Sequence, residues 1–124
     1  MTGAGALLYF TAQVAIVSQQ LHVDMPQVRA ISEDQRSALS SPLALAYIDP
    51  KFWWETEEEI SIKWHVLWSA DKRMLRCIAR HEVAHLALGG GLNWTKEESV
   101  RAEASADALI DKLWNEPAQC RYPR

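Results

Sequence analysis

The chain begins with a pattern of apolar positions that is typical of a helix. Residues 4–21 place apolar side chains three or four positions apart, and glutamines form a polar face. Positions at this spacing share one side of a helix. The apolar positions are Leu7, Leu8, Phe10, Val14, Val17 and Leu21. We therefore predict an N-terminal helix that ends before the turn signals Asp24 to Pro26.

The pattern then takes the shorter period of strands. The segment QVRAIS, residues 27–32, alternates, and PLALAYIDP, residues 42–50, is an apolar run between two prolines. The segment EISIKWHVLW, residues 59–68, places large apolar side chains at every second position. Those positions are Ile60, Ile62, Trp64, Val66 and Trp68. The chain is therefore expected to form three short strands over these segments.

An aromatic and acidic connection joins the second and third predicted strands. It contains Trp53 and Trp54, which fit core packing, an interface with a protein partner or a substrate groove. Packing in a core or an interface is the favoured interpretation. The acidic residues that follow are Glu55, Glu57, Glu58 and Glu59. We expect this acidic run to be a solvated loop.

A helical period returns after the third predicted strand. Ser69 or Asp71 can begin a helix, and the glycines at 89–91 can end it with a left-handed cap. The apolar positions of this helix are Met74, Leu75, Ile78, Val83, Leu86 and Leu88. Thr95 and Glu98 form a capping box that begins a last helix, which continues to residue 115.

The order of predicted elements is one helix, three strands and two further helices. This order is typical of an α+β fold in which helices pack on one face of a small sheet. The 124 residues contain no repeat, low-complexity tract or linker, so we expect a single domain over residues 1–124.

Composition narrows the range of partners and compartments. The hydrophobic fraction of 48% is ordinary for a globular protein, and a net charge of -3 leaves no basic stripe for nucleic acid. The longest apolar stretch, residues 6–17, is too short to span a bilayer and follows no basic residue, which argues against a membrane or a signal peptide. Only Cys77 and Cys120 are present, so no disulfide framework is implied and a cytoplasmic location is expected.

Candidate metal ligands occur in the segment ARHEVAHLALGGG, residues 79–91. His81 and His85 are four positions apart, so on a helix both imidazoles can face one point. A catalytic zinc site typically has three protein ligands and leaves a further position for water. Glu82, directly after the first histidine, is where such helices carry the general base.

The third ligand must come from another part of the chain. The metzincin pattern requires glycine and then histidine where this chain has Leu88 and Gly91, so that class is excluded. His22 and His65 have no supporting spacing. Glu103, on the last predicted helix, is the best candidate.

The helix that carries Glu103 has a stripe that is otherwise apolar except for Asp107. The stripe continues through Ala106, Asp107, Ile110, Leu113 and Trp114. Two carboxylates on a buried stripe repel each other and need a partner. A zinc ion with two histidines supplies that partner, and Asp107 can then accept the free N–H of a ligating histidine.

At these residues the sequence resembles the gluzincins, and most of all the ImmA/IrrE-type metallopeptidases of bacteria and their phages. HEVAH, residues 81–85, matches the HExxH motif of the family, and EASADALI, residues 103–110, matches its E-x-x-A-[D/N]-x-[F/L]-A motif in part. The matching positions are Glu103, Ala106, Asp107 and Leu109. Ile110 stands where alanine is usual, and the resemblance extends over residues 43–114.

The resemblance implies a minimal zincin-like domain and a function. Zn²⁺ would be bound by His81, His85 and Glu103, with Glu82 as the catalytic base and Asp107 beside a ligand. The expected activity is hydrolysis of peptide bonds in a protein or peptide substrate, in a bacterial cytoplasm and with a bacterial or phage origin.

Two features of the expected reaction stay open at this stage. An oxyanion needs an electrophilic group, for which the candidates are His65, Tyr47 and Tyr9. Zincins bind an extended substrate along an edge strand, and the resemblance suggests residues 59–68 for this role.

Two other interpretations fit the same residues. A non-enzymatic zincin-fold structural or assembly protein of a phage or prophage would keep the metal site without hydrolysing peptides. A surface helix with two solvated histidines would bind no metal.

Overall fold

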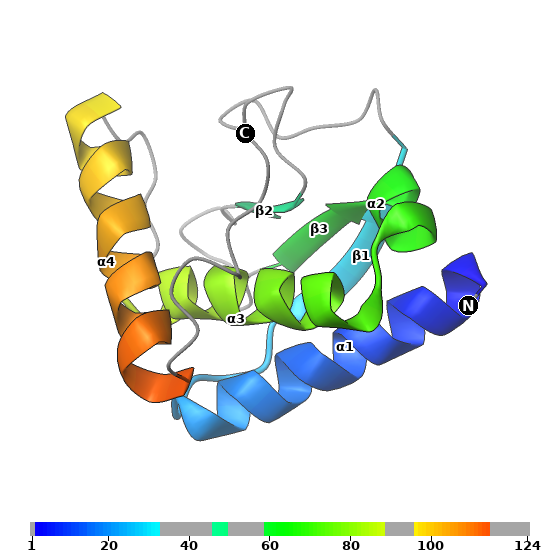
Figure 1. Cartoon of the computed structure of the whole chain (residues 1–124), viewed down its shortest axis with the longest axis horizontal. Helices are drawn as coiled ribbons and strands as arrows, with labels where there is room; N and C mark the ends of the chain where they lie inside the picture. Colours follow the sequence, from blue (N-terminus) through cyan, green and yellow to red (C-terminus); the bar gives the residue numbers. More distant parts are fainter. Residues whose placement is uncertain (1, 33–45, 50–58, 89–95, 115–124) are drawn as a thin grey trace, which may run out of the picture.

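The computed structural model describes residues 2–32, 46–49, 59–88 and 96–114, and every structural statement below concerns these residues. They form a mixed fold of helices and strands that is mostly helical (Figure 1), which confirms the general class expected from the sequence. The zincin-like fold itself stays a prediction. The elements are α1 (Gly3–Gln20), β1 (Gln27–Ile31), β2 (Ala46–Asp49), β3 (Glu59–Lys63), α2 (Trp64–Ser69), α3 (Lys72–Ala87) and α4 (Lys96–Trp114).

The sheet is built on a parallel pair, β1 and β3, whose register aligns Val28 with Ile60. β2 pairs antiparallel with the other side of β3, so the strand order is β1-β3-β2. All of β3 is buried. Ile60 and Ile62 project from one face of this strand into the main core.

The core lies between the sheet and the helices α1 and α3. Helix α1 contributes Ala6, Phe10, Val14 and Val17. Helix α3 contributes Leu75, Ile78, Ala79 and Val83. Because α3 packs against α1 and also contacts β2, it is held on two sides (Figure 1). This packing fixes the helix that carries the two histidines.

The third predicted strand is shorter than expected. It ends at Lys63, and residues 64–69 form the helix α2. The adjacent residues Val66 and Leu67 are both buried in this helix, whereas a strand would direct them to opposite faces. Trp68, predicted to pack inward, is 69% exposed. Both side chains pack into the main core from this helix, so the alternating pattern does not form a strand here.

The histidine-bearing helix begins where the sequence predicted. Asp71 is its N-cap, and the Asp71 carboxylate accepts a hydrogen bond of 2.8 Å from the amide of Met74. This contact satisfies one of the amides that a helix leaves without a partner in its first turn. The helix ends at Ala87, and Leu88, predicted as an apolar position, is exposed.

One expectation about a polar residue is wrong. Glu59 is not in a solvated loop, because it is buried in β3 and lies 2.9 Å from Nε of Arg29 on β1. Its Oε1 also accepts a hydrogen bond of 3.3 Å from Oγ of Ser61. Cys77, fully buried in α3, is disulfide-bonded, and the expected compartment stays a prediction.

Several sequence predictions lie outside the described residues. These are the roles of Trp53 and Trp54, the acidic residues at 55–58, the glycine cap at 89–91 and the capping box that begins at Thr95. Within the described ranges, none of the helices combines the length and apolar character needed to cross a bilayer.

Helix α1 ends in a left-handed residue. After the C-cap Leu21, His22 has φ 57°, and its amide donates to the carbonyl of Gln19 at 3.3 Å. The amide of Val23 donates to the carbonyl of Ser18 at 3.0 Å. This pair of bonds is the Schellman motif, in which glycine usually occupies the left-handed position. A histidine there carries a steric cost.

We predict that His22→Gly stabilises the protein, because glycine has no side-chain carbon to oppose a positive φ. The free energy of unfolding should rise by about 1 kcal/mol in denaturant titrations. Gln20→Gly, two residues earlier in a helical conformation, is the matched control and should lower it. A loss of stability in His22→Gly would contradict the assigned motif.

Candidate metal centre

Helix α3 places His81 and His85 on one buried face. The two residues are one turn apart, and both side chains are almost fully removed from solvent. Their rings meet edge to face with centroids 4.7 Å apart. As the sequence predicted, the spacing of four brings both Nε2 atoms to the same point, 3.1 Å from each other.

Helix α4 supplies the third group by packing on α3. A small apolar cluster joins Ala84 of α3 to Ala106 and Ile110 of α4. Near the end of α4, the Arg80 guanidinium lies over the Trp114 ring, 4.7 Å from its centroid. Figure 1 shows α4 crossing the second half of α3. This packing turns the stripe that contains Glu103 toward the histidines.

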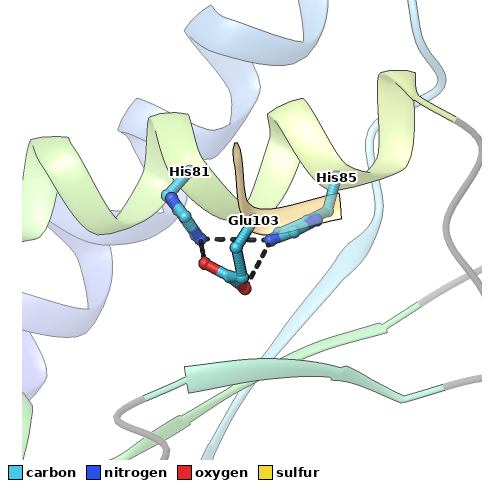
Figure 2. Close-up of side chains that lie close together, drawn as sticks. All are labelled: His81, His85 and Glu103. Atoms are coloured by element: carbon cyan, nitrogen blue, oxygen red, sulfur yellow. Dashed lines mark hydrogen bonds and ion pairs between the residues drawn. The ribbon is translucent and has the colours of Figure 1, made fainter. Parts of the chain in front are cut away.

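Glu103 contacts both histidines through separate oxygens (Figure 2). Its Oε2 lies 2.9 Å from Nε2 of His81, and its Oε1 lies 3.0 Å from Nε2 of His85. Within the described part of the chain, His81, His85 and Glu103 form a group whose ligand atoms all lie within 4.8 Å of one another. The structure thus brings together the three residues that the sequence predicted as ligands.

The two Nε2 atoms and the Glu103 carboxylate can be held together by protons or by a metal ion. Neutral rings that carry Nε2–H groups would donate to the two carboxylate oxygens, whereas rings with lone pairs on Nε2 need a cation between them and the carboxylate. A single metal ion satisfies both nitrogens and the carboxylate together. The donor set therefore fits a divalent cation.

The spacing of the ligand atoms also agrees with a shared ion. Metal bonds of about 2.0–2.2 Å at tetrahedral angles place neighbouring ligand atoms about 3.3 Å apart. The separations are 2.9 and 3.0 Å to the two different oxygens of Glu103 and 3.1 Å between the nitrogens, and with one ligand atom per residue the group lies within 4.8 Å. Two imidazoles and one carboxylate are donors that borderline divalent ions accept. The chain could thus hold an ion with little rearrangement.

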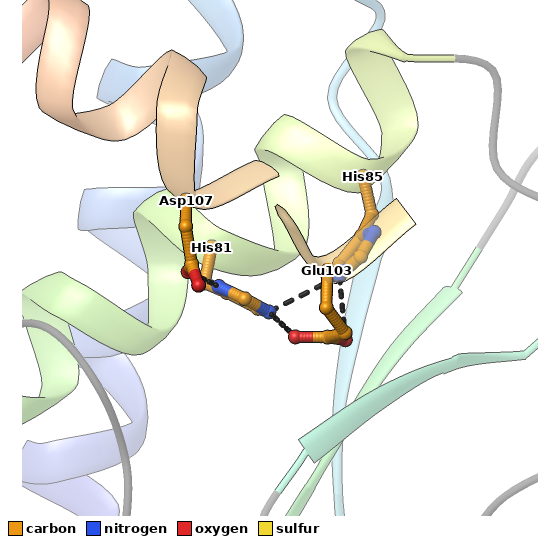
Figure 3. A network of polar contacts seen from close by, with 4 residues as sticks. All are labelled: His81, His85, Glu103 and Asp107. Atoms are coloured by element: carbon orange, nitrogen blue, oxygen red, sulfur yellow. Dashed lines mark hydrogen bonds and ion pairs between the residues drawn. The ribbon is translucent and has the colours of Figure 1, made fainter. Parts of the chain in front are cut away.

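Asp107 lies on the far side of the His81 ring (Figure 3). Its Oδ1 is 3.5 Å from Nδ1 of His81, one helical turn after Glu103. A proton on Nδ1 faces the carboxylate, which leaves Nε2 with the lone pair that a metal ligand requires. The structure thus brings Asp107 to a ring nitrogen of His81, as expected from the sequence, and its role in fixing the tautomer stays a prediction.

The electrostatics of Glu103 favour its charged form. Burial raises the pKa of this carboxyl group, but hydrogen bonds with His81 and His85 and the charge of those rings lower it more. The net pKa is well below its usual range. Glu103 is thus a carboxylate over the whole physiological range and is available as an anionic ligand.

Glu82, predicted as the catalytic base, is a buried residue of α3. It follows His81 directly, but it is not part of the three-residue ligand group found among the described residues. Its position is consistent with the predicted role, which stays a prediction.

The structure separates the three candidates for oxyanion stabilisation. Tyr9 lies under Nζ of Lys72, 5.5 Å from the ring centroid, at the first residue of α3. Nine residues of helix, about 13 Å, separate Lys72 from His81, so Tyr9 does not reach the ligand group. His65 is on α2 rather than on a strand, and Figure 1 places α2 beside the beginning of α3.

Tyr47 stays a candidate because its strand reaches the site. β2 contacts α3, and Figure 2 shows this strand beside the ligand group. We expected residues 59–68 to bind the substrate as an edge strand, and this expectation is wrong. In the described sheet β3 has β1 on one side and β2 on the other, so it is not an edge strand. In the described sheet, β2 is the edge strand next to α3.

Sequence reasoning missed the contact between Arg80 and Trp114. The signal was present, since Trp114 ends the inward stripe of α4 and Arg80 directly precedes the first histidine. The pair spans two helices, so neither segment alone indicates that these residues meet.

Comparisons of the chain with models of protein families, with curated proteins and with solved structures find no match. The assignment of the site rests on the geometry of its residues.

We predict that Asp107→Asn weakens metal binding by roughly ten- to a hundredfold, as is typical when the partner of a ligating histidine is changed. The amide can present its NH₂ group to Nδ1 and then favours the wrong tautomer. Isothermal titration with Zn²⁺ or Co²⁺ in competition with a chelator measures the affinity.

Asp111→Asn is the matched control, since Asp111 is exposed on the next turn of the same helix. It should bind metal like the unchanged protein. Equal affinities for the two asparagine variants would show that Asp107 does not support the ligand.

Proposed function

We propose that the protein is a zinc-dependent metallopeptidase whose ion is bound by His81, His85 and Glu103. The observation that carries the proposal is the convergence of two imidazole nitrogens and one carboxylate within a few ångströms of one another. Two histidines and a glutamate are a donor set of catalytic zinc sites. Three protein ligands leave room for water and substrate.

The residue Glu82 favours hydrolysis over other metal chemistry. The same three ligands would also suit iron in an oxygenase, which needs no additional acid. Glu82 is a buried residue of α3 that directly follows the ligand candidate His81. A general base for water is the role that this position supports.

In the proposed reaction each residue of the site has a separate role. A bound zinc ion supplies Lewis acidity, which acidifies water and polarises a carbonyl group. Glu82 accepts a proton from the attacking water and delivers it to the leaving amine. Asp107 keeps His81 in one orientation through Nδ1, and Glu103 supplies the anionic oxygen ligand from the second helix.

The substrate proposed for this site is an extended peptide segment. β2 is at the edge of the described sheet and contacts α3, so its outer backbone groups can pair with an extended chain. Such pairing is independent of side-chain sequence. Tyr47, on this strand, is the remaining candidate to stabilise the oxyanion.

We predict that Glu82→Gln abolishes hydrolysis while zinc remains bound, because the amide cannot accept the proton but leaves the three ligands in place. Turnover should fall by at least about a hundredfold, the usual contribution of a general base. The assay is cleavage of a diverse peptide library by the zinc-loaded protein, followed by mass spectrometry, with zinc content measured in parallel.

Glu97→Gln, an exposed change on α4, is the control and should leave cleavage intact. A protein that cleaves no peptide in the library, or a Glu82→Gln variant as active as the unchanged chain, would contradict the proposed activity. The first result, with zinc bound, would favour an assembly or structural role for the same fold.

A further inference from the structure

Helix α1 has an apolar outer surface as well as an apolar inner one. Its inner side is buried in the core. On the outer side, Ala4, Leu8, Ala12 and Ile16 are exposed, and we call these four residues the outer stripe. Leu8 is 73% exposed and Ile16 is 47% exposed. A surface helix normally carries polar side chains on such a face, so the outer stripe needs an explanation.

The same helix lacks charge. No Asp, Glu, Lys or Arg occurs before Asp24, although the chain as a whole has a net charge of -3. Helices that lie on a membrane surface usually carry lysine or arginine on their polar face, and α1 has neither. A strongly charged protein partner would find nothing complementary here. Two copies of α1, in contrast, can approach without repulsion between charged side chains.

The outer stripes of two copies are complementary in the size of their side chains. It alternates small and large residues at intervals of four, in the order Ala4, Leu8, Ala12, Ile16. A two-fold axis through its middle places Leu8 opposite Ala12 and Ala4 opposite Ile16. Each large side chain then meets a small one from the other copy, and the interface uses the same patch twice, as in most homodimers.

The direction of the stripe agrees with a common packing of helices. Residues spaced by four form a ridge inclined to the helix axis, and two such ridges align when the axes cross at about -50°. Residues 4 to 16 extend about 18 Å along the helix, at 1.5 Å per residue. The ridge therefore covers most of α1.

We infer that the protein associates with a second copy of itself through the outer stripe of α1, in an antiparallel and two-fold symmetric arrangement. The contact involves one helix from each copy, so its area is below the roughly 1,200 Å² of stable interfaces. The dimer is accordingly weak and depends on concentration. In Figure 1, α1 lies on the side of α3 away from β2, so the dimer leaves the metal centre uncovered.

Sedimentation velocity of the full chain over a range of concentrations tests this inference. We expect a monomer that becomes a dimer as the concentration rises. Leu8→Glu should remove the dimer, because the two-fold axis buries the new charge in each copy. Leu113→Glu is the matched control: Leu113 is 47% exposed, like Ile16, but lies on α4. It should dimerise like the unchanged chain.

The variant Ala12→Leu distinguishes a specific, shape-complementary dimer from non-specific hydrophobic association. A second large side chain opposite Leu8 should weaken the dimer by roughly tenfold or more through overpacking. Non-specific aggregation, or binding to neutral lipid vesicles in a parallel flotation assay, would instead become stronger with the added apolar surface. Stronger association of Ala12→Leu would overturn the inference, and so would a chain that stays monomeric at every concentration. Circular dichroism checks that each variant is folded.

Discussion

The site depends on one contact, that of the Glu103 carboxylate with the Nε2 atoms of His81 and His85. The three groups lie 2.9 to 3.1 Å apart, and either protons on the rings or a shared cation can hold them together. The contact also explains a feature of α4, whose inward stripe is apolar apart from Glu103 and Asp107. A cation gives Glu103 a counter-charge, and the His81 ring gives Asp107 a donor.

The two helices that meet at this contact are held differently. Helix α3 lies between α1 and the sheet and contributes much of the core, so its histidines are fixed by the fold. Helix α4 is attached by the small cluster around Ala106 and by the contact of Arg80 with Trp114. A metal ion shared by the two helices would add a strong bond to this weaker junction, so metal binding and the docking of α4 are expected to be coupled.

Local signals predicted much of this structure, and contacts between distant segments account for what they missed. Helical spacing found α1, α3 and α4, and the motif at 81–85 with the stripe at 103–107 found the ligands. The alternation at 59–68 was misleading, because Val66 and Leu67 pack into the main core from a helix, and the local pattern does not show this contact. Glu59 was misjudged for a similar reason: its partner Arg29 is on another strand, thirty residues earlier. Likewise, only the sheet order shows that β3 is central and that β2 is beside the site.

The measurement that tests the central claim most directly is the zinc content of the purified chain and its ligand variants, determined by elemental mass spectrometry after removal of loosely bound ions. The account predicts one zinc per chain in the unchanged protein and in the exposed variant Glu97→Ala, and none in His81→Ala or Glu103→Ala. The Glu103 variant is decisive because its residue comes from the second helix. Full zinc occupancy in Glu103→Ala, or no zinc in the unchanged protein when zinc is supplied, would contradict a site shared by α3 and α4.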